Sequence, residues 1–319
     1  MEKVLSYKDV VLYPEYSEIE SRDNVSTKIE FLGYEFKVPA VPANMACCID
    51  FKVAESLGKE GYFYILHRFY DYTCDVIPWL FKNRNSFPLS ISVGVKQYDL
   101  DFLQDLSESD FKIDFITIDV AHGHHILVKN ACEFFNKLKW NHKPKLIVGN
   151  FGSAAGAKDA FSWGADAIKV GLSMGAACTT YNNTGVGTPM YSIVKEIYDQ
   201  GMSIPIIADG QIREIGDVAK AIHAGASMVM IGGMFAACTN SPAMFNYEKT
   251  HKYFYGSASS KNKGHNKYVE GKENKIECNN LSALELLEKI QEGLRSTMSY
   301  AGVSDVYHIE KMRVRQRYV

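Results

Sequence analysis

Residues 146–172 read LIVGNFGSAAGAKDAFSWGADAIKVGL and hold one complete strand–helix–strand unit. The apolar runs 146–150 and 167–172 are nearly continuous, which is typical of parallel strands covered on both faces. Between them, residues 153–163 read as a helix, and the Gly-Ala that follows suits a helix C-terminus. The unit therefore predicts a parallel sheet whose strands are connected by helices.

The same alternation recurs along most of the chain and gives about eight strands. The other expected strands are residues 37–43, 62–66, 89–94, 115–121, 204–210 and 227–233. The other expected helices are residues 52–59, 75–84, 98–108, 124–138, 189–201, 213–225 and 281–300. This pattern predicts an α/β fold, a closed (β/α)8 TIM barrel. An open doubly wound sheet is the alternative, but the GxGxxG fingerprint of that fold is missing after the first strand.

One segment, residues 239–280, interrupts this rhythm because it is polar and rich in Lys, Asn and Gly. So long a connection within a domain is usually a functional loop or a disordered one. It follows the eighth expected strand, on the face where barrel active sites gather. We interpret residues 239–280 as a mobile active-site flap, although a charge run is often only a solvated loop. Residues 1–319 are expected to form a single catalytic domain.

Composition excludes several functional classes. The 319 residues are 46% hydrophobic and 23% charged, as in ordinary globular proteins, and a net charge of −2 argues against a nucleic-acid partner. No apolar run has membrane-spanning length, and the N-terminus lacks the apolar core of a signal peptide, so we expect a cytoplasmic protein with no membrane partner. The seven cysteines include no CxxC pair, which favours reduced thiols, most of them core residues such as Cys47 and Cys48.

The loop GLSMGAACTTYNNTGVGTP, residues 171–189, places Cys178 where a nucleophile would be expected. A cysteine thiolate needs a partner that lowers its pKa or handles protons. Thr179 and Thr180 can relay protons, and Glu270 could supply acid–base catalysis if the flap closes. The alternative is that Cys178 is a small structural residue in a tight turn, and spacing alone leaves both interpretations open.

Polar groups also follow other expected strands. Glycines after the sixth, seventh and eighth strands leave room for a phosphate to approach the backbone. Asp209 could bind ribose hydroxyls or cap the helix that starts near Arg213. Asp119, His122 and His124 contain metal-ligand types, but two histidines two residues apart are weak evidence for a metal site, and polar cofactor contacts are favoured.

Taken in order, these segments resemble the IMP dehydrogenase / GMP reductase family over nearly the whole chain. The matching segments are LSYKDVVLYP, SRDNVST, ANM, FYILHRF, ISVGVK, FITIDVAHGH, CTT with TGVG, IIADGQI, MVMIGGMF, YGSAS, VEGK and LRSTMSYAG. The chain is most similar to the short GMP reductases, which lack inserted CBS domains.

The resemblance implies a reaction and a set of binding residues. Cys178 would attack C2 of GMP, ammonia would depart, and a covalent thioimidate intermediate would form. Hydride from NADPH would then reach C2 and release IMP. Thr180 and Glu270 would transfer the protons of the departing ammonia. The residues implied to bind the nucleotide are Asp209, Gly210, Gly232, Gly233, Gly256, Ser257 and Gly271. Those implied to face the cofactor are Arg68, Asp119, Ala121 and His122, together with Ser21 and Arg22 from a neighbouring subunit of a homotetramer.

The length of the flap separates the two activities of the family. Dehydrogenases, which oxidise IMP to XMP with NAD, resemble one another in an Arg-Tyr pair on a longer flap. Here about ten residues separate Ser257-Ala258 from Val269-Glu270, with no Arg-Tyr pair between them. The short flap favours the reductase and leaves IMP dehydrogenase as the alternative.

The chain also departs from the family pattern. Ser173 and Met174 replace a glycine and a proline, which puts in doubt the monovalent cation (K⁺) that the resemblance implies at Gly175 and Cys178. Tyr181 stands where a basic residue is common, and Gln211 replaces the second glycine of DGG. A catalytically weak purine-nucleotide-binding paralogue and an unrelated barrel enzyme therefore remain as further alternatives.

Overall fold

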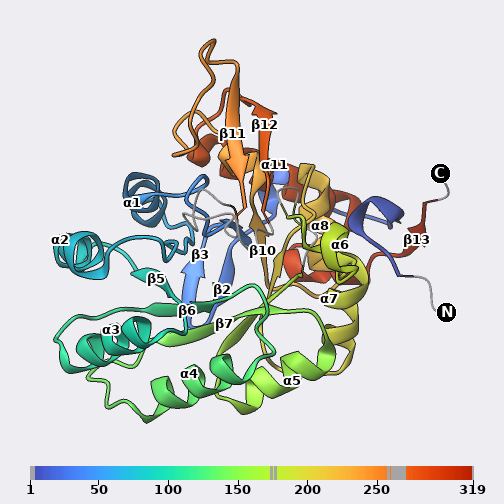
Figure 1. The fold of residues 1–319 in the computed structure, drawn as a ribbon. Coiled ribbons are helices and arrows are strands. Elements are labelled where there is room, and N and C mark those ends of the chain that lie inside the picture. The colour runs from blue at the N-terminus through green and yellow to red at the C-terminus, as the bar shows by residue number, and fades with distance from the viewer. Residues whose placement is uncertain (1–3, 173–174, 176–177, 257–258, 260–270, 318–319) are drawn as a thin grey trace.

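A computed structural model describes residues 4–172, 175, 178–256, 259 and 271–317 (Figure 1). Its main sheet has seven parallel strands in the order β4-β10-β9-β8-β7-β6-β5. They are β4 (Ala40–Pro42), β5 (Ser90–Val93), β6 (Phe115–Asp119), β7 (Lys145–Phe151), β8 (Ala167–Val170), β9 (Ile206–Asp209) and β10 (Met228–Ile231). Because the last strand pairs with the first, Val229 opposite Ala40, the sheet curls into a barrel. The (β/α)8 prediction is confirmed, and the open doubly wound alternative is wrong.

The second expected strand, residues 62–66, is the irregular part of the barrel. These residues are all buried, but Leu66 alone forms a bridge, with Ile91 of β5. On the other side, the N–H of Lys37 donates to the carbonyl of Gly61 at 3.1 Å. The segment thus fills the gap between β4 and β5 without a continuous ladder, and the prediction of a full strand there is wrong.

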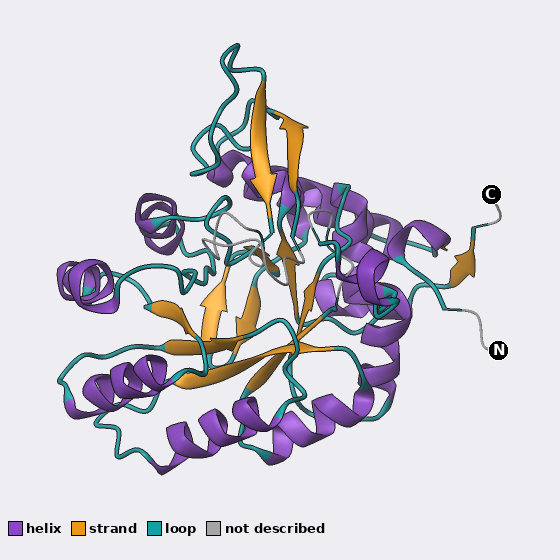
Figure 2. Cartoon of the chain, viewed as in Figure 1, coloured by secondary structure: helices purple, strands orange, loops and turns teal. Residues whose placement is uncertain are grey.

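Helices surround the sheet and connect its strands (Figures 1 and 2). They are α1 (Phe51–Lys59), α2 (Ile77–Asn83), α3 (Gln97–Glu108), α4 (Ile126–Lys137), α5 (Ala154–Ser162), α7 (Met190–Asp199), α8 (Ile215–His223) and α11 (Ala283–Ala301). Each matches a predicted helix within a few residues. Gly164 and Gly225, which follow α5 and α8, have φ of 86° and 107°, as expected where a chain leaves a helix through a left-handed turn.

Smaller elements were not expected from the sequence. Strands β1 (Val10–Leu12) and β13 (Val314–Gln316) pair antiparallel and join the two ends of the chain. Strands β2 (Ile29–Phe31) and β3 (Tyr34–Phe36) form a hairpin. Its two turn residues, Leu32 and Gly33, have φ of 54° and 88°, as a tight two-residue turn requires. The helical turns are η1 (Tyr7–Asp9), η2 (Arg22–Asn24), η3 (Tyr72–Val76) and η4 (Val306–Lys311).

Part of the segment predicted to be a flap is a regular hairpin. Strands β11 (His251–Tyr255) and β12 (Glu273–Glu277) pair antiparallel and project from the barrel (Figure 2). Lys252 holds the base of this hairpin: it is fully buried, and its Nζ donates to the carbonyls of Thr239 and Ser241 at 3.2 and 3.0 Å. The base is therefore anchored to the loop after β10, while movement of residues 239–280 as a flap stays a prediction.

The protein interior agrees with the expected role of most cysteines. Cys47 and Cys48 are fully buried, as the sequence predicted for core residues. In the described part of the chain, no helix combines the length and the apolar character needed to cross a membrane.

Candidate active site

A cavity of about 1440 Å³ opens at the carboxyl ends of the barrel strands. Most of the predicted site residues that the structure describes line it. They are Arg68, Asp119, Ala121, His122, Gly175, Cys178, Thr180, Asp209, Gly210, Gly232, Gly233 and Gly256. These residues lie far apart along the chain, and the fold brings them together around one cavity.

Cys178 lies on the wall of this cavity and is only partly buried. Its Sγ contacts Oγ1 of Thr180 at 3.3 Å. Thr180 begins α6 (Thr180–Thr184), a short helix that the sequence did not predict and that fixes the threonine beside the cysteine. A thiol that faces a cavity and touches a hydroxyl favours a chemical role over the role of a turn residue packed in the core.

The flap meets the cysteine through its backbone. Gly271 forms an antiparallel bridge with Cys178 and a parallel bridge with Ser259. Glu270 and Ser257, which were predicted to act in catalysis and nucleotide binding, lie outside the described residues. The described contact is thus between Cys178 and the residue that follows Glu270 in the sequence.

Lys169, which the sequence analysis missed, organises the floor of the cavity. It lies in β8 with 2% of its side chain exposed, and its Nζ contacts Oδ1 of Asp119 at 2.6 Å and Oδ2 of Asp209 at 3.4 Å. Its third partner is Oδ1 of Asn44, at 3.0 Å. A side chain on residue 149 would collide with it, since an added Cβ there would lie 2.4 Å from that of Lys169. Gly149 therefore lets β7 lie close to the Cβ of Lys169, whose buried ammonium contacts two predicted ligand-binding carboxylates.

The charges of this cluster stabilise one another. Burial alone would raise the pKa of Asp119, but the Lys169 ammonium outweighs it and holds this pKa below the ordinary value of 3.8. Burial would lower the pKa of Lys169, but Asp119 and Asp209 together raise it above 10.5. Asp119 and Lys169 are therefore both charged at neutral pH and form a buried ion pair at the floor of the cavity.

The structure excludes one of the two predicted roles of Asp209, that of a helix cap. Its Oδ2 accepts a hydrogen bond from Nδ2 of Asn150 at 2.8 Å and lies near Lys169. Helix α8 begins at Ile215, and its N-cap is instead Glu214, with Asp217 completing the capping box. The alternative that Asp209 caps this helix is therefore wrong.

The geometry does not support the alternative that Asp119, His122 and His124 bind a metal ion. Asp119 turns to Lys169, whereas Nε2 of His124 pairs with Oδ2 of Asp159 at 2.9 Å. Among the described residues, no three His, Cys, Asp or Glu side chains gather as a metal site would require. The K⁺ site at Gly175 and Cys178 stays a prediction, because Ser173 and Met174 lie outside the described residues.

His67, next to Arg68 in the chain, gives a pH-dependent prediction. It is buried and stacked on Tyr70, with ring centroids 4.2 Å apart. Burial lowers its pKa from 6.5 to about 4, so the unfolded chain binds a proton more readily than the folded one. Stability from a neutral His67 is present above pH 6.5 and is lost as the pH falls from there toward about 4. At pH 5 this loss amounts to about 2 kcal/mol relative to pH 7.5.

A His67→Phe variant keeps the stacked ring and removes the titration. Urea unfolding at several pH values should give a shallower acid decline for the variant than for the parent, whatever their difference at pH 7.5. Parallel declines in the two proteins would contradict the assignment.

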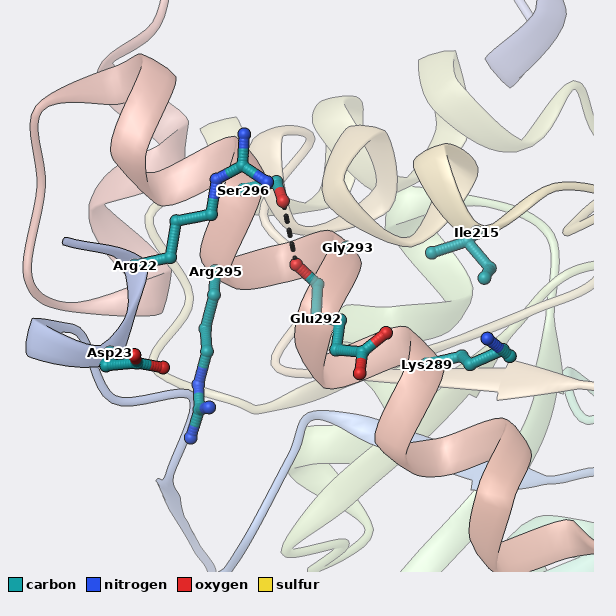
Figure 3. A pocket seen from close by; sticks show the side chains of 8 residues that line it. All are labelled: Arg22, Asp23, Ile215, Lys289, Glu292, Gly293, Arg295 and Ser296. Atoms are coloured by element: carbon teal, nitrogen blue, oxygen red, sulfur yellow. Dashed lines mark hydrogen bonds between the residues drawn. The ribbon is translucent and has the colours of Figure 1, made fainter.

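Figure 3 shows the residues around a second cavity, of about 510 Å³. Arg22 and Asp23 of η2 face it from one side, and Lys289, Glu292 and Arg295 of α11 from another. Ile215 and Lys289 line both cavities. Arg22 thus lies outside the Cys178 cavity of its own chain, and its predicted contact with a neighbouring subunit's cofactor stays a prediction, as does that of Ser21.

The fold and the cavity together define a (β/α)8-barrel protein with a partly exposed cysteine on the wall of a cavity that also holds charged side chains. The family model of the IMP dehydrogenase / GMP reductase domain matches residues 4–319. The GMP reductase of Staphylococcus aureus (strain JH9) is 40% identical over 310 residues, which cover 95% of this chain and 93% of the relative. The GMP reductase of Bacillus licheniformis is 40% identical over 308 residues, covering 95% and 92%.

The chain therefore belongs to the IMP dehydrogenase / GMP reductase family. The resemblance predicted from the motifs is confirmed. This is a family of oxidoreductases, and membership implies a nicotinamide cofactor.

Proposed function

We propose that this protein catalyses the NADPH-dependent reductive deamination of GMP to IMP and ammonia. The observation that carries the proposal is the placement of Cys178: its thiol lines the large cavity, touches Thr180 and is bridged at its backbone by the flap. The relatives named GMP reductase at 40% identity support the choice of substrate.

Cys178 would act as a covalent catalyst. Its thiolate would add to C2 of the purine, and the bond from C2 to the exocyclic nitrogen would break. Ammonia would then depart, and the purine would stay bound to the sulfur as a thioimidate. NADPH, when bound, would supply the hydride that C2 receives. The carbon–sulfur bond would then break, which releases IMP and regenerates the Cys178 thiolate. The purine ring gains a hydride in place of the amino group, so the nucleotide is reduced.

Two groups would manage the protons of the departing ammonia. Oγ1 of Thr180, 3.3 Å from the sulfur, can pass a proton between the thiol and a stronger acid–base group. We assign that stronger role to Glu270. The pairing of Gly271, its neighbour in the chain, with Cys178 supports this assignment.

The nucleotide would lie against the loops that follow β9 and β10. Asp209 is held by Asn150 and Lys169, which leaves it ordered and able to accept from ribose hydroxyls. Gly210, Gly232 and Gly233 line the same part of the cavity, where barrel enzymes commonly hold phosphate. We propose that Gly256, Ser257 and Gly271 complete the nucleotide site.

The residues at the other side of the cavity fit a nicotinamide cofactor. Pockets for one small ligand usually measure up to about 1000 Å³, so a cavity of about 1440 Å³ has room for a second molecule. Nε of Arg68 is buried without a hydrogen-bond partner in the described part of the chain, which suits an acceptor on a ligand. We propose that Arg68, Asp119, Ala121 and His122 hold this cofactor.

We also propose a homotetramer in which Ser21 and Arg22 reach the neighbouring subunit's cofactor. Arg22 faces an open cavity, and its guanidinium lies 6.0 Å from the ring of Tyr300. Tyr16 and Tyr300 are 84% and 58% exposed, as aromatic residues that await a partner surface would be.

The test is a screen of GMP, dGMP and IMP with NADPH, NADH, NADP⁺ and NAD⁺, monitored at the nicotinamide absorbance. We expect oxidation of NADPH with GMP. Formation of NADH from IMP and NAD⁺, with no reaction of GMP, would assign the protein as a dehydrogenase instead. Binding of GMP without turnover would identify a catalytically weak paralogue.

A further inference from the structure

Gln211, in the loop after β9, has an unusual backbone for its residue type. Its φ is +62°, in the left-handed region that favours glycine. Four other non-glycine residues in the described part of the chain share this feature: Leu32, Asn85, Lys249 and Asn280. Of the five, Gln211 alone lines the Cys178 cavity. A strained residue at a ligand cavity suggests that its side chain has a role that offsets the strain.

The contacts of Gln211 orient its side-chain amide. Oε1 accepts a hydrogen bond from the backbone N–H of Met190 at 3.2 Å. Met190 is the first residue of α7, and Pro189 at its N-cap offers no side-chain cap. A backbone N–H can only donate, so the oxygen of the amide must face α7 and the nitrogen must face away from it. Among the residues that the structure describes, Nε2 of Gln211 has no hydrogen-bond partner.

The residues around Gln211 indicate which kind of ligand atom its Nε2 would bind. Gly210, Gly232 and Gly233 line the same cavity from the loops after β9 and β10, and these loops commonly bind phosphate in barrels. These three glycines have no side-chain donors, so the neutral amide of Gln211 adds a directed N–H beside their backbone groups. A phosphate oxygen accepts such a bond more strongly than a neutral group does.

We infer that Gln211 is a specificity residue for the 5′-phosphate of the nucleotide, with its Nε2 donating to a phosphate oxygen. The inference rests on the proposed function, because it takes a purine nucleotide as the ligand. Through Oε1 the same side chain ties the phosphate to Met190, at the far end of the segment that begins at Cys178. Gln211 thus links recognition of the phosphate to the loop that carries the nucleophile.

The test compares Gln211→Gly and Gln211→Glu with the parent by calorimetric titration of GMP and of guanosine, without cofactor. The glycine variant removes the donor and suits the left-handed backbone, and we expect it to bind GMP about tenfold more weakly. The glutamate variant places a carboxylate near the phosphate, and we expect a loss of at least about 100-fold. Guanosine, which has no phosphate, should bind all three proteins equally.

Asn85→Gly is the matched control, because Asn85 also has a left-handed φ, of +69°, but lies outside the cavity. It should bind GMP like the parent. Equal GMP affinity in the parent and both Gln211 variants would overturn the inference, as would equal losses for GMP and guanosine. A parent that binds GMP but does not turn it over would contradict the proposed function alone, and a parent that binds no GMP would contradict both.

Discussion

Cys178→Ala is expected to abolish turnover of GMP while the protein remains folded and still binds the nucleotide. Removal of the nucleophile from an enzyme that works through a covalent intermediate commonly lowers kcat by roughly 10⁴- to 10⁶-fold. The Cys178 thiol is partly exposed, and its Sγ contacts the hydroxyl of Thr180 at 3.3 Å. Its removal should therefore change the free energy of unfolding by less than about 1 kcal/mol.

The measurements are NADPH consumption, calorimetric binding of GMP, and urea unfolding. Cys74→Ala is the control, since Cys74 is exposed and lies outside the cavity. It should retain the activity of the parent. Residual turnover by Cys178→Ala at a tenth of the parent rate or more would show that the cysteine is structural.

Lys169→Met is expected to give the largest combined loss of stability and ligand binding. The substitution keeps the length of the side chain but leaves Asp119 and Asp209 at the cavity floor without their shared counter-ion. Removing one partner of a buried ion pair typically costs about 3–5 kcal/mol. Both carboxylates should also lose their fixed positions, so we expect weaker binding of GMP and of the cofactor together.

The pH dependence of this loss identifies its cause. The Asp119 pKa is lowered from 3.8 in the folded parent, so its pairing adds stability above this pH and the gain disappears as the pH falls through the folded pKa. The deficit of Lys169→Met in urea unfolding should therefore persist from pH 7 down to about pH 4 and narrow as the pH falls below 3.8. A deficit that does not change with pH would point to lost packing alone.

Lys145→Met offers a matched comparison on the neighbouring strand β7. Its Nζ pairs with Asp166 at 3.6 Å, but the two side chains are 44% and 34% exposed. Exposed pairs contribute only about 0–1 kcal/mol, so this variant should resemble the parent in stability and binding.

Much of the barrel could be predicted because its signals are local. The apolar run and the helix of residues 146–172 each lie within a few consecutive residues, and the matching elements β7, α5 and β8 form where expected. Residues 62–66 have the same apolar composition, yet they pair at Leu66 alone. Composition reports that a segment is buried, whereas hydrogen-bond register depends on neighbours that the segment does not encode.

The elements that were missed depend on distant or subtle signals. Strands β1 and β13 pair Val10 with Gln316, at opposite ends of the chain. The β2–β3 hairpin did have a local signal, the Leu32-Gly33 pair between two short alternating runs. Hairpin β11–β12 lies within a polar segment whose apolar residues, such as Phe254, are too few to predict strands.

Cavity-lining residues that follow strands could be predicted from the sequence, whereas a residue inside a strand could not. Asp209 ends β9 and Cys178 lies in the loop that follows β8, and both line the cavity. Lys169 lies inside an apolar strand, and its partners Asp119 and Asn44 are 50 and 125 residues away. The sequence did contain one signal for this cluster, a lysine within an apolar strand. A buried ammonium needs an anionic or hydrogen-bond-accepting partner, so such a lysine indicates that partners lie nearby in the fold.

The central claim is that this chain reduces GMP and releases its amino group as ammonia. The most direct test is to quantify IMP, ammonia and oxidised cofactor after the protein is incubated with GMP and NADPH. The account predicts equal amounts of all three, with none formed by Cys178→Ala. Unchanged GMP, or cofactor oxidation without matching IMP and ammonia, would contradict it.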